Sequence, residues 1–335
     1  MIHMPALNTV CGKGFGMAAC SMLRVLVTAS HDDLTVFALP TSVAASGLAR
    51  IRTIGGGGCV QPLNFKFVHD DRVSGQLAFT GATPAARFLL VTDGGNKAVH
   101  VIDVVHGAHA GYVAAPGSIS YPTSVAAWGT KVAVSVYVRG GAPSFVQLYE
   151  GTGALWTITR RIIGPVVHTC GVRFTDDGEE LVVADDCDGS FCVSLFRVND
   201  GAFVRHLVTG LHECPADVEE CGEYGWALTE WYFGSILFAG GASYGDILVG
   251  THGGRYGDYY GDFNYPTTMA FVSGFGLVVR DNGVSEDSGD EDSGDQGRVQ
   301  IFVTPDAVAM AAMSVMRTTW MATVLRFAIS VSVCV

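Results

Sequence analysis

Short runs of Val, Leu, Ile and Phe recur along this sequence, and clusters of Gly, Asp, Asn and Pro separate them. Examples are the segments 89–92, 98–102, 131–136, 181–184 and 193–196. Runs of this length that end in turn-forming residues are typical of buried β-strands. The pattern therefore predicts an all-β protein in which many short strands are joined by tight turns.

The ends of corresponding strands recur at intervals of about 45 residues, which indicates a repeated structural unit. These ends are Ala29, Asp93, Ser135, Asp185, Glu230 and Asp281. Each unit is long enough for about four strands, and one such sheet cannot cover both of its own faces. We therefore expect a six-bladed β-propeller, in which four-stranded antiparallel blades close into a ring.

The last unit is the most regular one. A Gly- and Tyr-rich stretch, 250–265, precedes Pro266 and a strand-like segment, Met269–Val279. Arg280-Asp281-Asn282-Gly283 follows, and the unit ends in Gly297-Arg-Val-Gln-Ile-Phe302. This arrangement resembles the NHL-repeat family of β-propellers. The resemblance extends over residues 21–303, although Ser135 replaces the Asp of the motif and the third and fifth units lack its Asn.

This resemblance implies three regions. Residues 1–20 form an N-terminal leader, and residues 21–303 form the NHL-like propeller. Residues 304–335 form an apolar C-terminal tail that we expect to be partly helical, since good helix formers occupy its first half. Arg317 and Arg326 interrupt the tail, so that a docked helix is favoured over a membrane span, which needs about 18 uninterrupted apolar residues.

The recurring polar residues after the second strand of each unit are expected to form structural turns. The candidates are Asp93, Asn96, Asp185, Asp281 and Asn282. An Asp side chain accepts hydrogen bonds from backbone N–H groups just beyond it, and Gly or Asn tolerates a positive φ. Contact with a ligand is the alternative role for these side chains.

Successive connections in a meander alternate between its two ends. The segments 251–265, 284–297 and 186–190 are therefore expected on the same face of the ring. Tyrosine offers a large contact area at modest entropic cost and is enriched where proteins meet. We predict a partner-binding patch made by Arg255, Tyr256, Asp258, Tyr259 and Tyr260.

The segment 286–295 is a tandem acidic duplication that contributes six of the acids in a chain of net charge −12. Its spacing does not match a calcium-binding loop, so a solvated insertion is the favoured interpretation and calcium binding the alternative.

Only 20 Lys and Arg residues are present, and they are scattered. Nucleic acid is therefore disfavoured as a partner, because a phosphate backbone needs clustered cations.

The nine cysteines include no CxxC pair, and they are expected to be buried apolar residues of a reducing compartment. Residues 1–20 lack the basic start and apolar core of a signal peptide, so we predict a cytoplasmic protein. Cys187 and Cys192 flank a short turn, and they are the pair that oxidation would join.

No recognised catalytic motif occurs in the sequence. His168, Cys170, His212 and Cys214 supply the ligand types of a zinc site, but the two pairs are out of register by one residue. Asp217 and Glu219 are the acids expected on an innermost strand, where propeller lactonases hold a metal. We therefore assign no catalytic residue, no metal ligand and no cofactor.

These observations favour a non-catalytic scaffold that binds a macromolecular partner, most plausibly a protein, through one loop face. NHL domains often serve as recognition modules of ubiquitin ligases, so the resemblance implies a link to that pathway. Two alternatives stay open: a metal-dependent lactonase- or lyase-like enzyme, and an RNA-binding NHL domain. The oligomeric state is not predicted.

Overall fold

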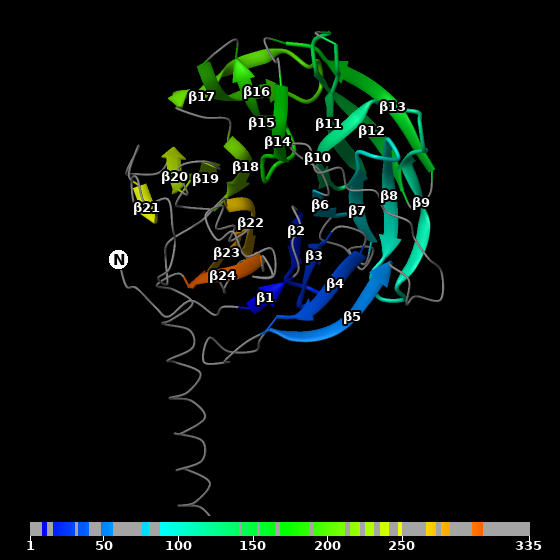
Figure 1. Cartoon of the computed structure of the whole chain (residues 1–335). Coiled ribbons are helices and arrows are strands. Elements are labelled where there is room, and N and C mark those ends of the chain that lie inside the picture. Colours follow the sequence, from blue (N-terminus) through cyan, green and yellow to red (C-terminus); the bar gives the residue numbers. More distant parts are fainter. Residues whose placement is uncertain are drawn as a thin grey trace, which may run out of the picture.

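A computed structural model describes the chain over residues 9–11, 16–30, 33–39, 48–55, 76–80, 88–140, 142–152, 155–164, 168–187, 190–211, 215–221, 225–230, 235–240, 247–249, 266–272, 276–281 and 297–303. Within these ranges the chain is all-β, and its strands form six four-stranded antiparallel sheets. Figure 1 shows the sheets arranged radially around a common axis. The predicted propeller arrangement of four-stranded antiparallel blades is thus confirmed.

Five sheets are consecutive meanders, each running outward from the axis in chain order. The first contains β2 (Met17–Cys20), β3 (Val25–Ala29), β4 (Asp33–Ala38) and β5 (Ala49–Gly55). The second contains β6 (Leu77–Phe79), β7 (Phe88–Asp93), β8 (Ala98–Asp103) and β9 (Ala108–Ala114). The third contains β10 (Tyr121–Trp128), β11 (Lys131–Tyr137), β12 (Phe145–Thr152) and β13 (Leu155–Ile162).

The fourth sheet contains β14 (His168–Phe174), β15 (Glu180–Cys187), β16 (Ser190–Arg197) and β17 (Phe203–Leu211). The fifth contains β18 (Pro215–Glu220), β19 (Gly225–Glu230), β20 (Ser235–Gly240) and β21 (Ile247–Val249). The last sheet contains β22 (Pro266–Val272), β23 (Gly276–Asp281) and β24 (Gly297–Val303). Its outermost strand is β1 (Thr9–Cys11), which comes from the other end of the sequence.

The pairing of β1 with β24 joins the beginning of the chain to its last sheet, with Thr9 opposite Val299. The expected leader, residues 1–20, therefore contributes one strand to the last sheet and the innermost strand of the first. A sheet completed from both ends of the chain holds the ring together, because the first and last sheets cannot separate without breaking this ladder.

The innermost strands contact each other in sequence around the axis: β2, β6, β10, β14, β18, β22 and β2 again. Side-chain hydrogen bonds reinforce some of these contacts. Thr123 Oγ1 donates to the carbonyl oxygen of Thr169 at 3.0 Å, and the backbone N–H of Val172 donates to Ser124 Oγ at 3.2 Å. These bonds link the third sheet to the fourth.

Apolar side chains on both faces of the sheets fill the space between neighbours. Val27 and Leu34 of the first sheet pack with Leu89 and Ile102 of the second, and all four are almost completely buried. Burial on both faces explains why the strands read as continuous apolar runs and not as an alternating pattern. Among the described residues no helix is long and apolar enough to cross a membrane. The tail 304–335, expected to be partly helical, lies outside the described residues.

Candidate binding face

The register of the last sheet brings the first residues of β22 and β24 to the same end of the ring. Pro266, where β22 begins, stands opposite Asp281, where β23 ends. Asp281 stands in turn opposite Arg298, at the beginning of β24. Both β22 and β24 therefore begin at the same end of the ring. We call this end of the ring, where consecutive sheets are joined, the linking face.

The predicted contact residues Arg255, Tyr256, Asp258, Tyr259 and Tyr260 lie outside the described residues, as do Asn282 and the acidic insertion 286–295. The geometry of the linking face is therefore derived from the second and third sheets. At this face, the connections between β7 and β8 and between β9 and β10 are described throughout.

Asp93 ends β7 at the linking face, and its side chain is completely buried. Its carboxylate accepts a hydrogen bond from the backbone N–H of Asn96 at 2.9 Å and another from the Asn96 side-chain amide at 2.8 Å. These contacts close the turn between β7 and β8, which is the type of contact that a turn-forming Asp makes. Asp281 ends β23 and Asp185 lies two residues before the end of β15, and both are also completely buried.

Two histidines extend from Asp93 toward the outer strand of the second sheet. His100 Nε2 lies 3.2 Å from Asp93 Oδ2, and His100 Nδ1 lies 3.3 Å from His109 Nε2. Tyr112 packs against both rings. Burial, followed by the neighbouring His100, lowers the pKa of His109. His109 is therefore neutral at pH 7 and adds no charge to this region.

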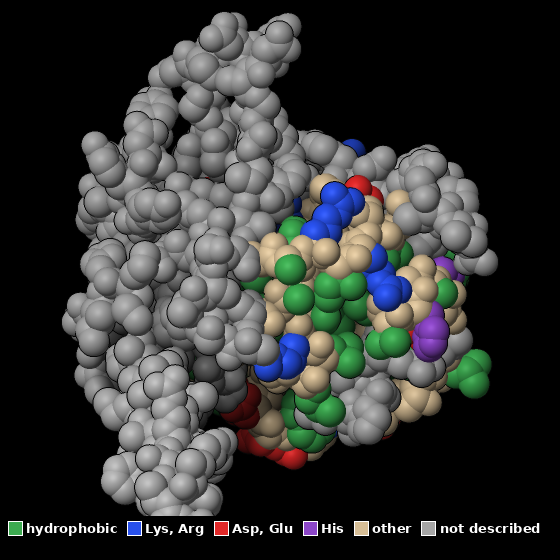
Figure 2. Space-filling view, turned by 90° about the horizontal axis from the view of Figure 1, so that it is seen from below, with side chains coloured by type: hydrophobic (Ala, Val, Ile, Leu, Met, Phe, Trp, Pro, Cys, Tyr) green, Lys and Arg blue, Asp and Glu red, His purple; other side chains and the backbone are tan. Residues whose placement is uncertain are grey.

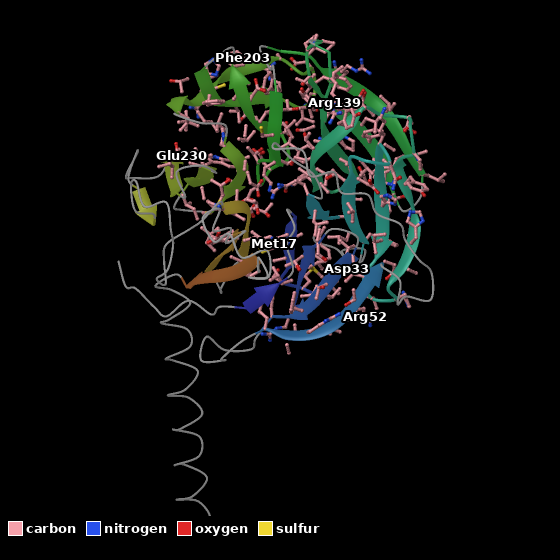
Figure 3. The ribbon with its side chains drawn as sticks, in the orientation of Figure 1. Met17, Asp33, Arg52, Arg139, Phe203 and Glu230 are labelled. Atoms are coloured by element: carbon pink, nitrogen blue, oxygen red, sulfur yellow. The ribbon has the colours of Figure 1, made fainter. Side chains whose placement is uncertain are left out.

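A basic and aromatic cluster at the linking face was not anticipated from the sequence. The Tyr121 ring, at the start of β10, is contacted by two cations. Lys97 Nζ is 5.2 Å from the ring centroid, and Arg139 Cζ is 4.5 Å from it. Lys97 follows the Asp93 turn with a positive φ of 53°, and Arg139 follows β11. Figure 3 labels Arg139 in the region of the third sheet.

The outer part of the third sheet continues this cluster. Arg161 Cζ lies 3.9 Å above the ring centroid of Phe145, at the linking-face ends of β13 and β12. Burial raises the pKa of nearby Tyr149 to about 12, while the charge of Arg161 acts in the opposite direction. Tyr149 is thus uncharged at pH 7, and the positive charge of Arg161 is not neutralised by it. We define the basic row as Lys97, Tyr121, Arg139, Phe145 and Arg161.

The acids expected near the axis are joined to neighbouring sheets. Asp217, completely buried, accepts hydrogen bonds from the backbone N–H groups of Val218 and Met269, at 2.9 and 3.0 Å. Glu219 accepts from the backbone N–H of Phe271 at 2.9 Å. Arg173 of β14 pairs with Asp217 at 3.3 Å and with Glu219 at 2.7 Å. The two carboxylates thus connect the fourth, fifth and last sheets.

These bonds occupy the oxygens that a metal site would need. Within the described ranges, no group of three or more His, Cys, Asp or Glu side chains is arranged to hold a metal ion. His212 and Cys214 of the considered zinc site lie outside the described residues, as does the side chain of His168. Cys170 is buried.

The network around Asp217 predicts a pH-dependent contribution to stability. Burial raises the pKa of Asp217 to about 6, with Arg173 and the N–H of Met269 acting in the opposite direction. A raised pKa means that the folded chain binds this proton more tightly than the unfolded chain. The contribution of Asp217 to stability is therefore greatest below about pH 4 and decreases as the pH rises through about 6.

This effect is measured as the free energy of unfolding of the wild type minus that of Asp217→Asn. We expect the difference to decrease by roughly 2 to 3 kcal/mol between about pH 4 and pH 7. Asp200→Asn is the control, because a hydrogen bond from the Ala202 backbone lowers the pKa of Asp200 and gives a dependence of opposite sign. A difference for Asp217 that grows with pH would show that Arg173 outweighs burial.

Figure 2 shows one face of the molecule, on which the Lys and Arg side chains of the described residues are spread among hydrophobic and other side chains. On this face the described residues do not form the long cationic track that a nucleic-acid backbone requires.

Neither the family models nor the curated proteins contain a match to this chain. By contrast, 843 chains of solved structures resemble it. One comes from the crystal structure of a nidogen/laminin complex, with a TM-score of 0.47 and 11% identical residues. The alignment covers 69% of this chain and 76% of that chain. A likeness at this identity concerns the arrangement of the backbone and not the binding partners.

Proposed function

We propose that this chain is a non-catalytic propeller of the NHL-repeat type that binds a protein partner through its linking face. The observation that carries the proposal is the register of Pro266, Asp281 and Arg298. It supports a common surface for the Tyr-rich segment 251–265 and the acidic insertion 286–295. The basic row, which the second and third sheets contribute, lies at the same end of the ring.

A recognition role linked to ubiquitin-ligase pathways is the finer form of this proposal, and it rests on the NHL resemblance. The lactonase-like alternative gains no support from Asp217 and Glu219, because their oxygens bind Arg173 and the backbone of the last sheet. The RNA-binding alternative requires a larger cationic surface than the described residues provide.

Cytoplasmic location is also a proposal, and one residue bears on it directly. Cys192 is disulfide-bonded, whereas Cys20 and Cys221 are buried free thiols. Disulfides are rare in the cytosol and persist in oxidising compartments. Cys192 is buried, so the unreduced protein from its native compartment is alkylated in denaturant: a modified Cys192 supports the cytosol, and an unmodified Cys192 contradicts it.

The binding proposal is tested by capturing partners with the wild type and with a variant in which Tyr256, Tyr259 and Tyr260 are all Ala. We expect the variant to lose most of the specifically captured protein, because aromatic anchors dominate interface energies. Tyr112→Phe is the matched control, because Tyr112 packs on His100 and His109 in the second sheet. Equal capture by the triple variant and the wild type would exclude the Tyr-rich patch as the binding site.

A further inference from the structure

The basic row crosses all four strands of the third sheet at the linking face. The register places Tyr121 opposite Tyr137, Val136 opposite Phe145, and Gln147 opposite Arg161. Adjacent strands lie about 4.8 Å apart, so the row spans about 15 Å from β10 to β13. An extended peptide covers this distance with four to five residues, at about 3.3 Å for each residue.

The charge of this region is opposite to that of the whole chain. The protein has a net charge of −12, yet residues 121–164 contain Lys131, Arg139, Arg160 and Arg161 and a single acid. That acid, Glu150, stands opposite Lys131 at the far end of β12, on the opposite face of the ring. At the neighbouring turn, Asp93 is buried and its carboxylate is used by Asn96 and His100. Within residues 121–164, basic side chains therefore outnumber acidic ones, and the single acid is remote from the basic row.

The aromatic rings hold these cations in place. A cation stacked on a ring loses part of its side-chain freedom before any partner binds, and a stacked guanidinium still donates hydrogen bonds from its edge. Carboxylate groups are suited to such donors, because charge-assisted hydrogen bonds to Arg are strong and directional. The row thus combines preorganised cations with apolar ring surface, which favours a ligand that carries both acidic and apolar groups.

We propose that the basic row binds a short acidic peptide segment of the protein partner, which lies across the ends of β10, β11, β12 and β13. This inference rests on the proposed function and specifies the chemistry of the partner. A peptide is favoured over a nucleic acid because the row is short and the rest of the acidic protein repels a long polyanion. Lys97 and Arg139 contact the inner part of the segment, and Arg161 contacts its outer part.

The test uses the full chain and a fluorescein-labelled peptide of ten glutamates, with binding followed by fluorescence polarisation. The wild type should bind, and its affinity should decrease as salt is added, because salt screens exposed charges. The double variant Lys97→Ala/Arg139→Ala and the single variant Arg161→Ala should weaken binding by about tenfold and about fivefold. Circular dichroism of each variant verifies that it is folded.

Lys131→Ala is the matched control. Lys131 also stacks on an aromatic ring, with its Nζ 5.4 Å from the centroid of Trp128, but it lies on the opposite face. Its replacement should change the affinity less than twofold, since it removes the same charge away from the row. An equal loss in Lys131→Ala and in the row variants would show general charge attraction and overturn the proposal. Tighter binding of a ten-nucleotide oligo(dT) would overturn it in favour of nucleic acid.

Capture of the partner by each variant distinguishes failure of this inference from failure of the proposed function. A partner that is captured by the wild type, lost on replacement of the three tyrosines and retained by the Lys97/Arg139 variant would exclude only the basic row. Loss with both variants supports the two proposals together. Retention by both variants would exclude the linking face altogether.

Discussion

Replacement of Arg280 by Ala is expected to lower the free energy of unfolding by about 3 kcal/mol or more. Arg280 lies on β23 and is completely buried. Its Nη1 donates to the carbonyl oxygens of Gly16, at 2.9 Å, and of Ala29, at 2.7 Å. Ala29 ends β3 and Gly16 directly precedes β2, so this side chain joins the last sheet to the first, where the ring closes. Its removal leaves a cavity and two carbonyl oxygens without this donor.

Urea unfolding followed by tryptophan fluorescence measures this effect. Arg197→Ala is the control, because Arg197 forms an exposed pair with Asp200 that is expected to contribute less than about 1 kcal/mol. Arg280→Met should restore part of the packing but not the hydrogen bonds, and its stability should fall between those of the wild type and Arg280→Ala. Equal losses in Arg280→Ala and Arg197→Ala would contradict a ring-closing role for Arg280.

Replacement of Gly178 by Ala is expected to cost about 2 to 3 kcal/mol. Gly178 has a φ of +69°, and an added Cβ would lie 2.2 Å from Cδ2 of Trp128. Trp128 belongs to the third sheet and donates from Nε1 to the carbonyl oxygen of Asp176 at 2.9 Å. The new methyl group must displace the indole ring and break this bond between the third and fourth sheets.

Gly129→Ala isolates the contribution of Trp128. Gly129 has a φ of +58°, but an added Cβ would meet nothing within 4 Å. This variant should lower the free energy of unfolding by about 1 to 2 kcal/mol, because only the left-handed backbone conformation disfavours alanine there. Thermal or urea unfolding of both variants gives the comparison. If the two glycine variants lose the same stability, the contact between the third and fourth sheets at Trp128 contributes nothing.

The local parts of the fold were predictable from the sequence, because strands and turns are encoded by neighbouring residues. Runs such as Leu89–Thr92 and Leu181–Ala184 coincide with β7 and β15. The pairing of β1 with β24 was not predicted. A three-residue strand carries almost no pattern, and its partner lies at the other end of the chain.

The basic row was also missed, for a related reason. Lys97 lies in the turn after β7, Tyr121 at the start of β10 and Arg139 after β11, and only the closed ring brings them together. The sequence contains one signal that points to this region, the near absence of acids from 121–164 in an acidic chain. The burial of Arg280 was not predicted either, because its position beside the turn-forming Asp281 and Asn282 gives no sign that both faces of β23 are buried.

The central claim, that a protein partner binds at the linking face, is tested most directly by photo-cross-linking from each end of the ring. A benzoylphenylalanine is placed at Ser118, exposed between β9 and β10, or at Glu179, exposed between β14 and β15 on the opposite face. We predict that the partner is cross-linked from position 118 and not from position 179. Cross-linking from position 179 alone, or equally from both positions, would contradict the claim.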